Sequence, residues 1–428
     1  MPREHREDLM SDMTAAGPDA LLAEALLDPE GRADPYRLYA ALREQAPAVR
    51  TAQGPVVVAR YDDCEWVLRD PRFGKGTPRP WERHGLTEAD WHERFPGWAR
   101  NRRALLFLDP PDHTRVRRLV AKAFTPRTVE RLRPDIVRLT DAILDRFDGV
   151  VDVISDLALA LPITVIGEML GVPEADRHEL QPLVRASIVA LDTQVALDEL
   201  DVALRARDAV VERMEGLIAE RRAHPADDLL SHLIHVEEAG DELTPDELGS
   251  TITQLFAAGF ETTTNLIGNG LLALLDHPDQ MARLRADRSL MGPAVEEMLR
   301  WDSPVQLDSR QPLVDVDVHG IPVRPGEQVI TLLGAANRDP RTFPDPDRFD
   351  VGRDGAAPLS FGSGIHYCLG AALARAEGQV VFDRLLTRFP VLEPAWPDGT
   401  RPAVGPSPVL RGRMSLPVRL DRQPGHRR

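Results

Sequence analysis

A ten-residue segment near the end of the chain, a glycine-rich loop with a single cysteine followed by a helix, constrains the fold more than any other feature. Residues 361–370 place Cys368, one of only two cysteines, directly before a run of strong helix formers. Backbone N–H groups at a helix N-terminus stabilise the thiolate that a metal ion requires. Glycines permit positive φ and a close approach of the backbone to a flat ligand. The segment therefore predicts a thiolate ligand on a tight loop.

A long helix is predicted in the middle of the chain. Thr244 and Glu247 have the spacing of a capping box, with Pro245 at the first helical position. The helical pattern continues to about residue 275, where His277 and Pro278 end it. Such a helix is roughly 45 Å long at the standard rise and can cross the whole molecule.

The centre of this predicted helix is unusually poor helix material. Gly259 costs about 1 kcal/mol relative to alanine, and it is followed by Glu261 and Thr262. Threonine side chains can also bond to the carbonyl four residues earlier and bend the helix. A defect of this kind is tolerated where something must fit against the backbone.

The remaining patterns predict a mainly α protein with smaller β-sheets, an α+β class. Helical periodicity dominates residues 126–301, and residues 73–107 read as a loop region with short helices. Alternating segments predict strands at residues 56–59, 313–318, 321–323 and 328–333.

Composition narrows the possible locations and partners. Apolar residues make up 43% and charged residues 28% of the 428, a globular balance, and the formal net charge of −16 argues against nucleic acid. Cys64 falls in an ordinary helical pattern far from Cys368, which argues against a disulfide framework. Residues 1–17 lack the apolar core of a signal peptide, and no segment reads as a membrane span. A cytoplasmic protein without a membrane partner is expected.

These motifs together resemble the cytochrome P450 family. Residues 361–370 match its haem-binding loop, Phe-Gly-x-Gly-x-His-x-Cys-x-Gly, at every fixed position, and residues 258–262 match its oxygen-binding segment. The resemblance covers about residues 35–417. It implies the cytochrome P450 fold, a single large triangular domain over residues 31–420 with haem between the long central helix and the cysteine-loop helix. Residues 1–30 are then expected to be a flexible segment and residues 421–428 a disordered tail.

The resemblance also implies a cofactor and a set of site residues. The cofactor is haem b, iron protoporphyrin IX, with Cys368 as the axial thiolate. The remaining cofactor-binding residues, some of them cationic partners for the haem propionates, are His113, Arg117, Arg310, His366, Phe361, Gly362, Gly370 and Ala258. In the catalytic set, Gly259 makes room for dioxygen, Thr262 hydrogen-bonds to it, and Glu261 helps relay protons.

A carboxylate and two arginines are implied to support the loop from behind. Glu297 and Arg300 are three residues apart on a predicted helix, and as an exposed pair they would contribute under about 1 kcal/mol. In the family the corresponding pair is buried and coupled to a downstream arginine, for which Arg348 is the candidate.

The expected activity is that of a bacterial-type haem-thiolate monooxygenase. It would insert one oxygen atom of O₂ into a hydrophobic small molecule by hydroxylation or epoxidation, with a secondary metabolite, terpenoid, steroid or macrolide as the candidate classes. The substrate pocket is predicted to include Leu255, Phe256, Val305, Leu307 and Val409. Two alternatives remain: a peroxide-driven peroxygenase and a non-catalytic haem-binding or recruiting module. The presence of Glu261 and Thr262 argues against the peroxygenase.

Electrons are expected from a separate protein, because the chain has no flavin or dinucleotide-binding pattern. A ferredoxin and its reductase are the predicted partners. A basic cluster near the predicted cysteine side is a candidate docking face, formed by Arg102, Arg103, Arg115, Arg118 and Lys122.

Overall fold

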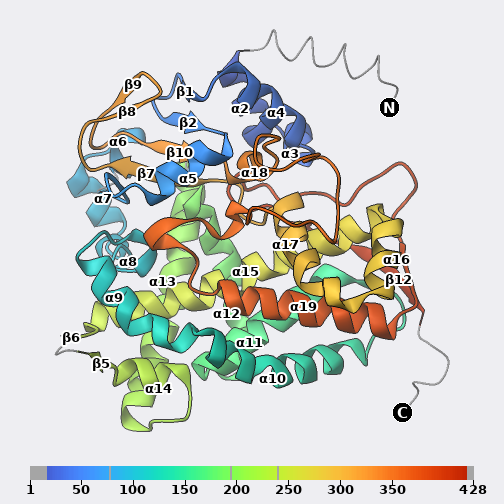
Figure 1. Cartoon of the computed structure of the whole chain (residues 1–428). Helices are drawn as coiled ribbons and strands as arrows, with labels where there is room; N and C mark the ends of the chain where they lie inside the picture. The colour runs from blue at the N-terminus through green and yellow to red at the C-terminus, as the bar shows by residue number, and fades with distance from the viewer. Residues whose placement is uncertain (1–16, 77–78, 193–194, 239–240, 422–428) are drawn as a thin grey trace.

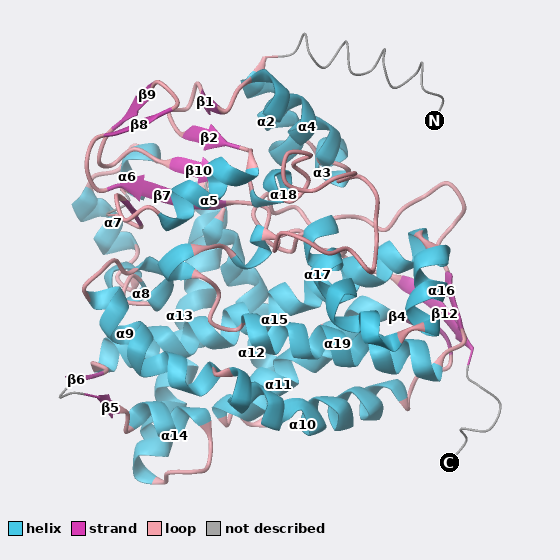
Figure 2. Ribbon diagram, viewed as in Figure 1, coloured by secondary structure: helices cyan, strands magenta, loops and turns pink. Residues whose placement is uncertain are grey.

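The long helix α15 (Pro245–Asp276) runs through the middle of the molecule, and several other helices pack against it (Figures 1 and 2). The computed structural model describes residues 17–76, 79–192, 195–238 and 241–421. Thr244 Oγ1 accepts a hydrogen bond from the backbone N–H of Glu247 at 3.3 Å, and the Glu247 carboxylate accepts one from the backbone N–H of Thr244 at 2.9 Å. The predicted capping box is thus confirmed, and it fixes where the helix begins.

The helical layer around α15 has two sides. On one side lie helices from the middle of the chain: α11 (Ala160–Leu170), α12 (Glu174–Ile188), α13 (Leu197–Ala223) and α14 (Leu229–Ile234). On the other lie α16 (Pro278–Ala286), α17 (Met291–Trp301) and α19 (Ala371–Arg388), with α10 (Pro126–Leu144) packed along α19 (Figure 1). Buried apolar side chains from all of these helices, including Leu180 and Val184 of α12, form the main core.

The main sheet stands at one end of the helical layer and has the strand order β1-β2-β10-β7-β3. Strands β2 and β10 are parallel, and the other neighbours are antiparallel. The strands are β1 (Ala48–Arg50), β2 (Val56–Val58), β10 (Val329–Thr331), β7 (Asp308–Pro312) and β3 (Phe73–Gly74).

Smaller sheets complete the β structure. A three-stranded sheet has the order β11-β12-β4, and two hairpins pair β8 with β9 and β5 with β6. Their bounds are β4 (Gly149–Asp152), β5 (Glu237–Glu238), β6 (Asp241–Glu242), β8 (Val316–Val318), β9 (Ile321–Val323), β11 (Val391–Pro394) and β12 (Pro417–Asp421). Sequence patterns located β2, β8, β9 and β10, whereas residues 313–315 were wrongly included in a strand.

The N-terminal boundary of the ordered domain was predicted too late. Residues 18–30 belong to helices α2 (Pro18–Leu27) and α3 (Pro29–Ala33), and α2 packs against both α3 and α4 (Tyr36–Gln45). Leu21, Leu22 and Ala25 are buried in this contact, so the segment is not the flexible extension that was expected. Residues 1–16 and 422–428 lie outside the described residues.

The aromatic segment between β3 and α9 (Asp112–Ala121) folds into short helices, as predicted. These are α6 (Pro80–Arg83), α7 (Glu88–Arg94) and α8 (Trp98–Asn101). Trp81, Trp91 and Phe95 form a separate small core with Leu200 and Leu204 of α13. The tryptophans therefore fasten this segment to α13.

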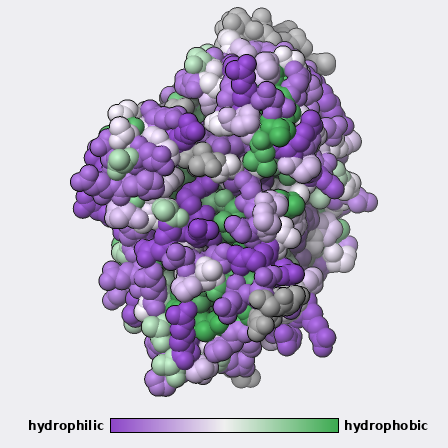
Figure 3. All heavy atoms as spheres, turned by 90° about the vertical axis from the view of Figure 1, so that its left-hand side faces the viewer, coloured by the Kyte–Doolittle hydropathy of each residue, from purple (hydrophilic) through white to green (hydrophobic). Residues whose placement is uncertain are grey.

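The outer surface is predominantly polar on the face shown in Figure 3, where hydrophobic residues form only small separate areas. Within the described residues, no single helix has the length and apolar character needed to cross a membrane. One bent pair, residues 154–170 with 174–191, reaches that length and composition only when its two halves are taken together.

Candidate active site

The cysteine loop is held by glycines in the left-handed region and by contact with helix α5 (Tyr61–Arg69). Gly362 and Gly364 both have φ of 69°. A Cβ on Gly364 would lie 2.3 Å from the carbonyl oxygen of Leu68, so this position also needs glycine for space. Gly370 has an ordinary φ of −83° and caps α19. The backbone conformation at Gly370 therefore does not itself require glycine.

Cys368 lies two residues before Gly370, the N-cap residue of α19. Solvent reaches its thiol, and nearby groups would stabilise the thiolate form. Burial by the surrounding protein raises the pKa of the thiol, while hydrogen bonds from the backbone N–H groups of Gly370 and Ala371 and the charges of Arg117 and Arg375 lower it. The groups that lower the pKa are those that would stabilise a thiolate. By contrast, the Cys64 thiol is completely buried and 3.5 Å from the carbonyl oxygen of Val58.

The middle of α15 carries small and hydroxyl side chains on two adjacent faces. Thr262 Oγ1 donates to the Ala258 carbonyl at 2.9 Å, and Thr263 Oγ1 donates to the Gly259 carbonyl at 3.2 Å. Ala258 and Thr262 are four residues apart and share a helix face. A Cβ on Gly259 would lie 3.2 Å from Ile166 Cγ1 of α11. The missing side chain of Gly259 thus serves the close packing of α11 on α15.

Glu261 forms an ion pair with Arg185 of α12, at 3.5 Å between Oε2 and Nε. The carboxylate is largely buried, and burial raises its pKa while the charge of Arg185 opposes the rise. A buried acid with a raised pKa retains its proton closer to neutral pH than an exposed one. Glu261 can therefore hold and release a proton beside Thr262.

Two histidines from different elements meet at the cysteine loop. The rings of His113, on α9, and His366 have centroids 4.3 Å apart. In the described part of the chain, both ring nitrogens of His113 and Nε2 of His366 are buried without a hydrogen-bond partner. Arg117 Nη2 donates to the carbonyl oxygen of Tyr367 at 2.6 Å, which ties α9 to the loop.

A second arginine joins this region from strand β7. Arg310 is buried and pairs with Asp308 at 2.6 Å, and Lys75 Nζ lies 2.8 Å from the same carboxylate. Burial, together with the positive charges of Arg310 and Lys75 and the neighbouring His113, lowers the pKa of His366 to about 2. Lys75 was missed in the sequence, although it is one of only two lysines there.

This donor set fits a haem. A solvent-accessible thiol at the N-terminus of α19 can provide the axial ligand, and unpartnered buried ring nitrogens beside Arg117, Arg310 and Lys75 can receive two carboxylates. Burial and, after it, the nearby positive charges lower the pKa of both histidines, and an anion placed among these cations would offset the effect of the charges.

The support behind the loop contains a different arginine from the one predicted. Glu297 and Arg300 are both buried and form two hydrogen bonds, at 2.6 and 2.9 Å. The second arginine on Glu297 is Arg353, at 3.0 Å, with a side chain only 15% exposed. Arg348 is 64% exposed and directs its carbonyl, not its guanidinium, toward Arg300 and Arg353. The assignment of Arg348 was therefore wrong.

The predicted pocket residues do not form one group. Phe256 is completely buried and packs near Phe260, on the side of α15 opposite Ala258, so its assignment to the pocket was wrong. Leu307 and Val409 pack with the N-terminal helices, and Val305 forms an isolated bridge with Leu410. Leu255 is only partly buried and lies on the same side of α15 as Ala258.

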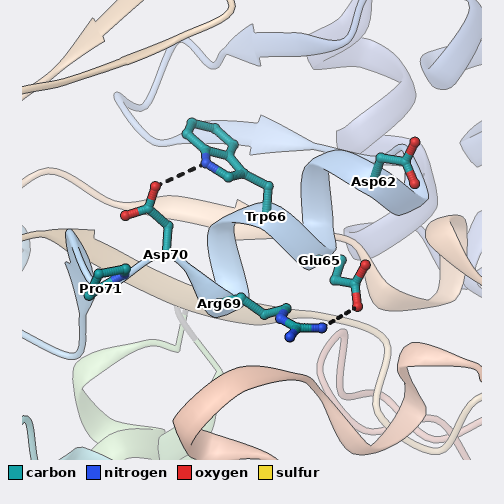
Figure 4. A pocket seen from close by; sticks show the side chains of 6 residues that line it. All are labelled: Asp62, Glu65, Trp66, Arg69, Asp70 and Pro71. Atoms are coloured by element: carbon teal, nitrogen blue, oxygen red, sulfur yellow. Dashed lines mark hydrogen bonds and ion pairs between the residues drawn. The ribbon is translucent and has the colours of Figure 1, made fainter.

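A separate surface recess of about 480 Å³ lies on α5 (Figure 4). Its lining residues are Asp62, Glu65, Trp66, Arg69, Asp70 and Pro71. Trp66 Nε1 donates to Asp70 at 3.0 Å, and Arg69 pairs with Glu65 at 3.2 Å. The recess contains none of the predicted site residues, and three of its charged side chains, Glu65, Arg69 and Asp70, already have partners.

The basic cluster considered for docking is partly neutralised within the chain. Arg115 pairs with the buried Glu247, and Arg118 pairs with Asp241. Arg102 stacks on Phe107. The cluster is therefore less positive than its sequence suggests.

Comparison with known proteins identifies the family. The cytochrome P450 family model matches residues 200–400. The chain is 43% identical over 396 residues to cytochrome P450 107B1 of Saccharopolyspora erythraea, covering 90% of this chain and 95% of that protein. It is 42% identical over 431 residues to the cytochrome P450 monooxygenase PikC of Streptomyces venezuelae, covering 96% of each.

Solved structures agree with the sequence relatives. The crystal structure of P450BioI, in complex with an acyl carrier protein ligated to hexadec-9Z-enoic acid, superposes with a TM-score of 0.85 at 36% identity and covers 92% of this chain and 99% of that one. The chain therefore belongs to the cytochrome P450 family and is a P450 monooxygenase.

Proposed function

We propose that this protein inserts one oxygen atom of O₂ into a hydrophobic secondary metabolite, with Cys368 as the thiolate ligand of haem b and a ferredoxin as electron donor. The observation that carries the proposal is the exposed thiol of Cys368 two residues before the N-cap of α19, in a chain that also carries Glu261 and Thr262 on α15. Haem, when bound, supplies the redox chemistry of oxygen activation.

The residues of the chain have distinct roles in this proposal. His113, Arg117, His366 and Arg310 bind the propionates, and Phe361, Gly362, Gly370 and Ala258 lie against the macrocycle. Glu261 holds a proton at its carboxyl group, and the Thr262 hydroxyl exchanges its bond to the Ala258 carbonyl for one to the oxygen substrate. Leu255 and Val305 contribute apolar surface to the substrate pocket.

The names of two relatives support a bulky hydrophobic substrate. The 6-deoxyerythronolide B hydroxylase of S. erythraea is 40% identical, and the vitamin D(3) 25-hydroxylase of Pseudonocardia autotrophica is 42% identical. Both names describe hydroxylation of a large, mostly apolar molecule. A macrolide or a steroid-like compound is therefore the first class to screen, by the substrate-induced shift of the haem absorption.

Thr262→Ala tests the proton-delivery role and the peroxygenase alternative together. With O₂ and reduced ferredoxin, we expect product formed per O₂ consumed to fall tenfold or more, because the positioned hydroxyl is lost. Thr263→Ala, which removes a neighbouring hydroxyl bonded to the Gly259 carbonyl, serves as the control. Wild-type turnover that proceeds with hydrogen peroxide but not with ferredoxin and O₂ would contradict the proposal.

The ferredoxin is proposed to dock on the cysteine side, over α9. Arg118 and Lys122 are exposed there, and α9 contacts the loop through Arg117. Arg118→Glu with Lys122→Glu should weaken ferredoxin-driven turnover and leave peroxide-driven turnover unchanged. Arg118→Glu also breaks an exposed pair with Asp241, whereas substitution of Arg115 would break its pair with the buried Glu247 of the α15 capping box, so Arg115 is unsuitable for this test. Equal losses in both assays would count against this docking face.

A further inference from the structure

Two arginines from different helices flank one aromatic ring near α15. Arg102 follows α8, Arg207 lies on α13, and Phe107 belongs to the short 3₁₀ helix η1 (Leu105–Phe107) between them. The guanidinium carbons lie 5.0 Å (Arg102) and 5.9 Å (Arg207) from the centroid of the Phe107 ring. The ring therefore holds two positive charges in one small region.

Most hydrogen-bond donors of these two arginines are uncommitted. Arg102 Nη2 donates to the Gly76 carbonyl at 2.9 Å, and Arg207 Nη2 donates to the Asn101 carbonyl at 3.4 Å. A guanidinium has five N–H donors. In the part of the chain that the structure describes, neither arginine forms an ion pair with a carboxylate, whereas nearby arginines on the same elements do: Arg100 with Glu215 and Arg205 with Asp201.

The two partly buried guanidinium charges are unfavourable without a counter-ion. Burial lowers the pKa of Arg102, and it lowers the pKa of Arg207 to about 10. The negative charge of Asp109 raises the pKa of Arg102, and that of Asp208 raises the pKa of Arg207, although neither carboxylate is within ion-pair distance. The positive charge of Arg102 lowers the pKa of Arg207. Both groups still carry their charge at neutral pH, so an anion between or beside them would be stabilised.

The arginine pair lies next to the face of α15 that carries the proposed oxygen-binding residues. The backbone N–H of Leu106, beside Phe107, donates to Gln254 Oε1 at 3.1 Å. Gln254 and Ala258 are four residues apart, so they share a helix face and are about 6 Å apart along its axis. An elongated molecule held at the arginines can thus extend along α15 toward Ala258.

We propose that Arg102 and Arg207 bind the carboxylate or phosphate terminus of an amphipathic substrate whose apolar part extends toward Ala258. The inference rests on the proposed monooxygenase function and names a substrate class within it.

The test measures binding to the haem-loaded protein by equilibrium dialysis, without turnover. The probes are dodecanoate, dodecyl phosphate and the uncharged dodecanol, and the variants are Arg102→Gln and Arg207→Gln. We expect the wild-type protein to bind at least one anion about tenfold or more tightly than dodecanol. Each variant should lose about tenfold in affinity for that anion and keep its affinity for dodecanol. The preferred anion then distinguishes carboxylate from phosphate.

Arg205→Gln is the matched control, because Arg205 is an exposed arginine on the same helix, paired with Asp201. It should bind all three probes like the wild type. Arg207→Lys keeps the charge but not the fork of donors, and should fall between wild type and Arg207→Gln. Thermal melting confirms that each variant is folded before binding is compared.

Two results would overturn the inference: equal wild-type affinities for the anions and dodecanol, or equal losses for charged and uncharged probes in the Gln variants. Neither result affects the monooxygenase proposal, which the carbon monoxide spectrum and the turnover assays test independently.

Discussion

The Glu297 carboxylate accepts hydrogen bonds from two arginines, Arg300 and Arg353, behind the cysteine loop. These three side chains support the loop. Arg300 also donates to the carbonyls of Asn337 and Pro346, and Arg353 to that of Pro344. The carboxylate thus fastens α17 to the irregular segment before the loop. Because the group is buried, its removal would leave two cations without their partner.

Glu297→Leu is expected to lower the free energy of unfolding by about 3–5 kcal/mol, the usual effect of breaking a buried ion pair. Arg353→Met should destabilise in the same direction, and Arg348→Met, on an exposed side chain, should change stability by less than about 0.5 kcal/mol. Urea unfolding monitored by circular dichroism measures all three. Equal effects for Arg348→Met and Arg353→Met would contradict the assignment of Arg353.

Glu377 is a second buried carboxyl, and it has no partner among the described residues. It lies on α19, nine residues after Cys368, and burial raises its pKa to about 8. The folded state therefore keeps the proton while the unfolded chain, with a value near 4.5, loses it. Stability contributed by this group is consequently lost as the pH rises from about 4.5 to about 8.

Glu377→Gln should remove that loss. We expect the variant to equal the wild type in unfolding free energy near pH 4 and to be the more stable of the two at pH 8. Denaturant unfolding at both pH values is the measurement. A variant that is less stable than the wild type at pH 8 would show that the carboxylate is ionised and paired in the folded protein.

The sequence predicted the residues of local motifs better than it predicted the ion-pair partners of individual side chains. Cys368, Glu297 and Arg300 follow from fixed local spacings. The choice between Arg348 and Arg353 depends on the path of an irregular backbone, which no periodicity encodes. Lys75 reaches Asp308 through sheet pairing between residues more than 200 positions apart, so local sequence gives no sign of it.

Elements with strong local signals were predicted, and elements fixed by tertiary contacts were not. Helix α15 begins at its capping box because the sequence satisfies the terminal N–H groups locally. Strand β7, with the sequence Asp-Ser-Arg-Gln-Pro, lacks the β-branched residues typical of strands and is ordered by pairing with β10 and β3. Helix α2 was missed because its burial depends on α4.

The contact between the cysteine loop and α5 leads to a prediction at the element scale. Gly362 and Gly364 share φ of 69°, but only Gly364 approaches another backbone. Gly362→Ala should lower the free energy of unfolding by about 1–3 kcal/mol, because φ of 69° with ψ of −162° is a conformation that essentially only glycine adopts. Gly364→Ala should lower it further and reduce the haem content, because α5 or the loop must move. Equal effects of the two substitutions, measured by unfolding and haem absorbance, would show that the contact with α5 is unimportant.

At the scale of the whole molecule, one buried aspartate joins the two ends of the described chain. Asp302 accepts hydrogen bonds from Tyr36 at 2.7 Å, from Arg411 at 2.5 Å and from Arg413 at 3.1 Å. Burial alone would raise the pKa of Asp302, but the two arginines outweigh it and lower the pKa from 3.8 to about 2. Its stabilising effect is therefore fully present above pH 3.8 and is lost as the pH falls through about 2.

Asp302→Asn tests this connection between the chain ends. At neutral pH we expect a loss of about 3–5 kcal/mol, because two buried arginines lose their counter-charge. The difference from wild type should shrink as the pH is lowered from about 4 toward 2. Unfolding free energies across this range provide the measurement, and a difference that does not change with pH would contradict the assigned role.

The central claim, that the Cys368 thiolate ligates haem iron, is tested most directly by the carbon monoxide difference spectrum of the reduced protein. The wild type should show the absorption band characteristic of thiolate-ligated iron. Cys368→Ala should lose that band, and Cys64→Ala, which removes the other thiol of the chain, should retain it. A Cys368→Ala protein that keeps both its haem and the band would contradict the account.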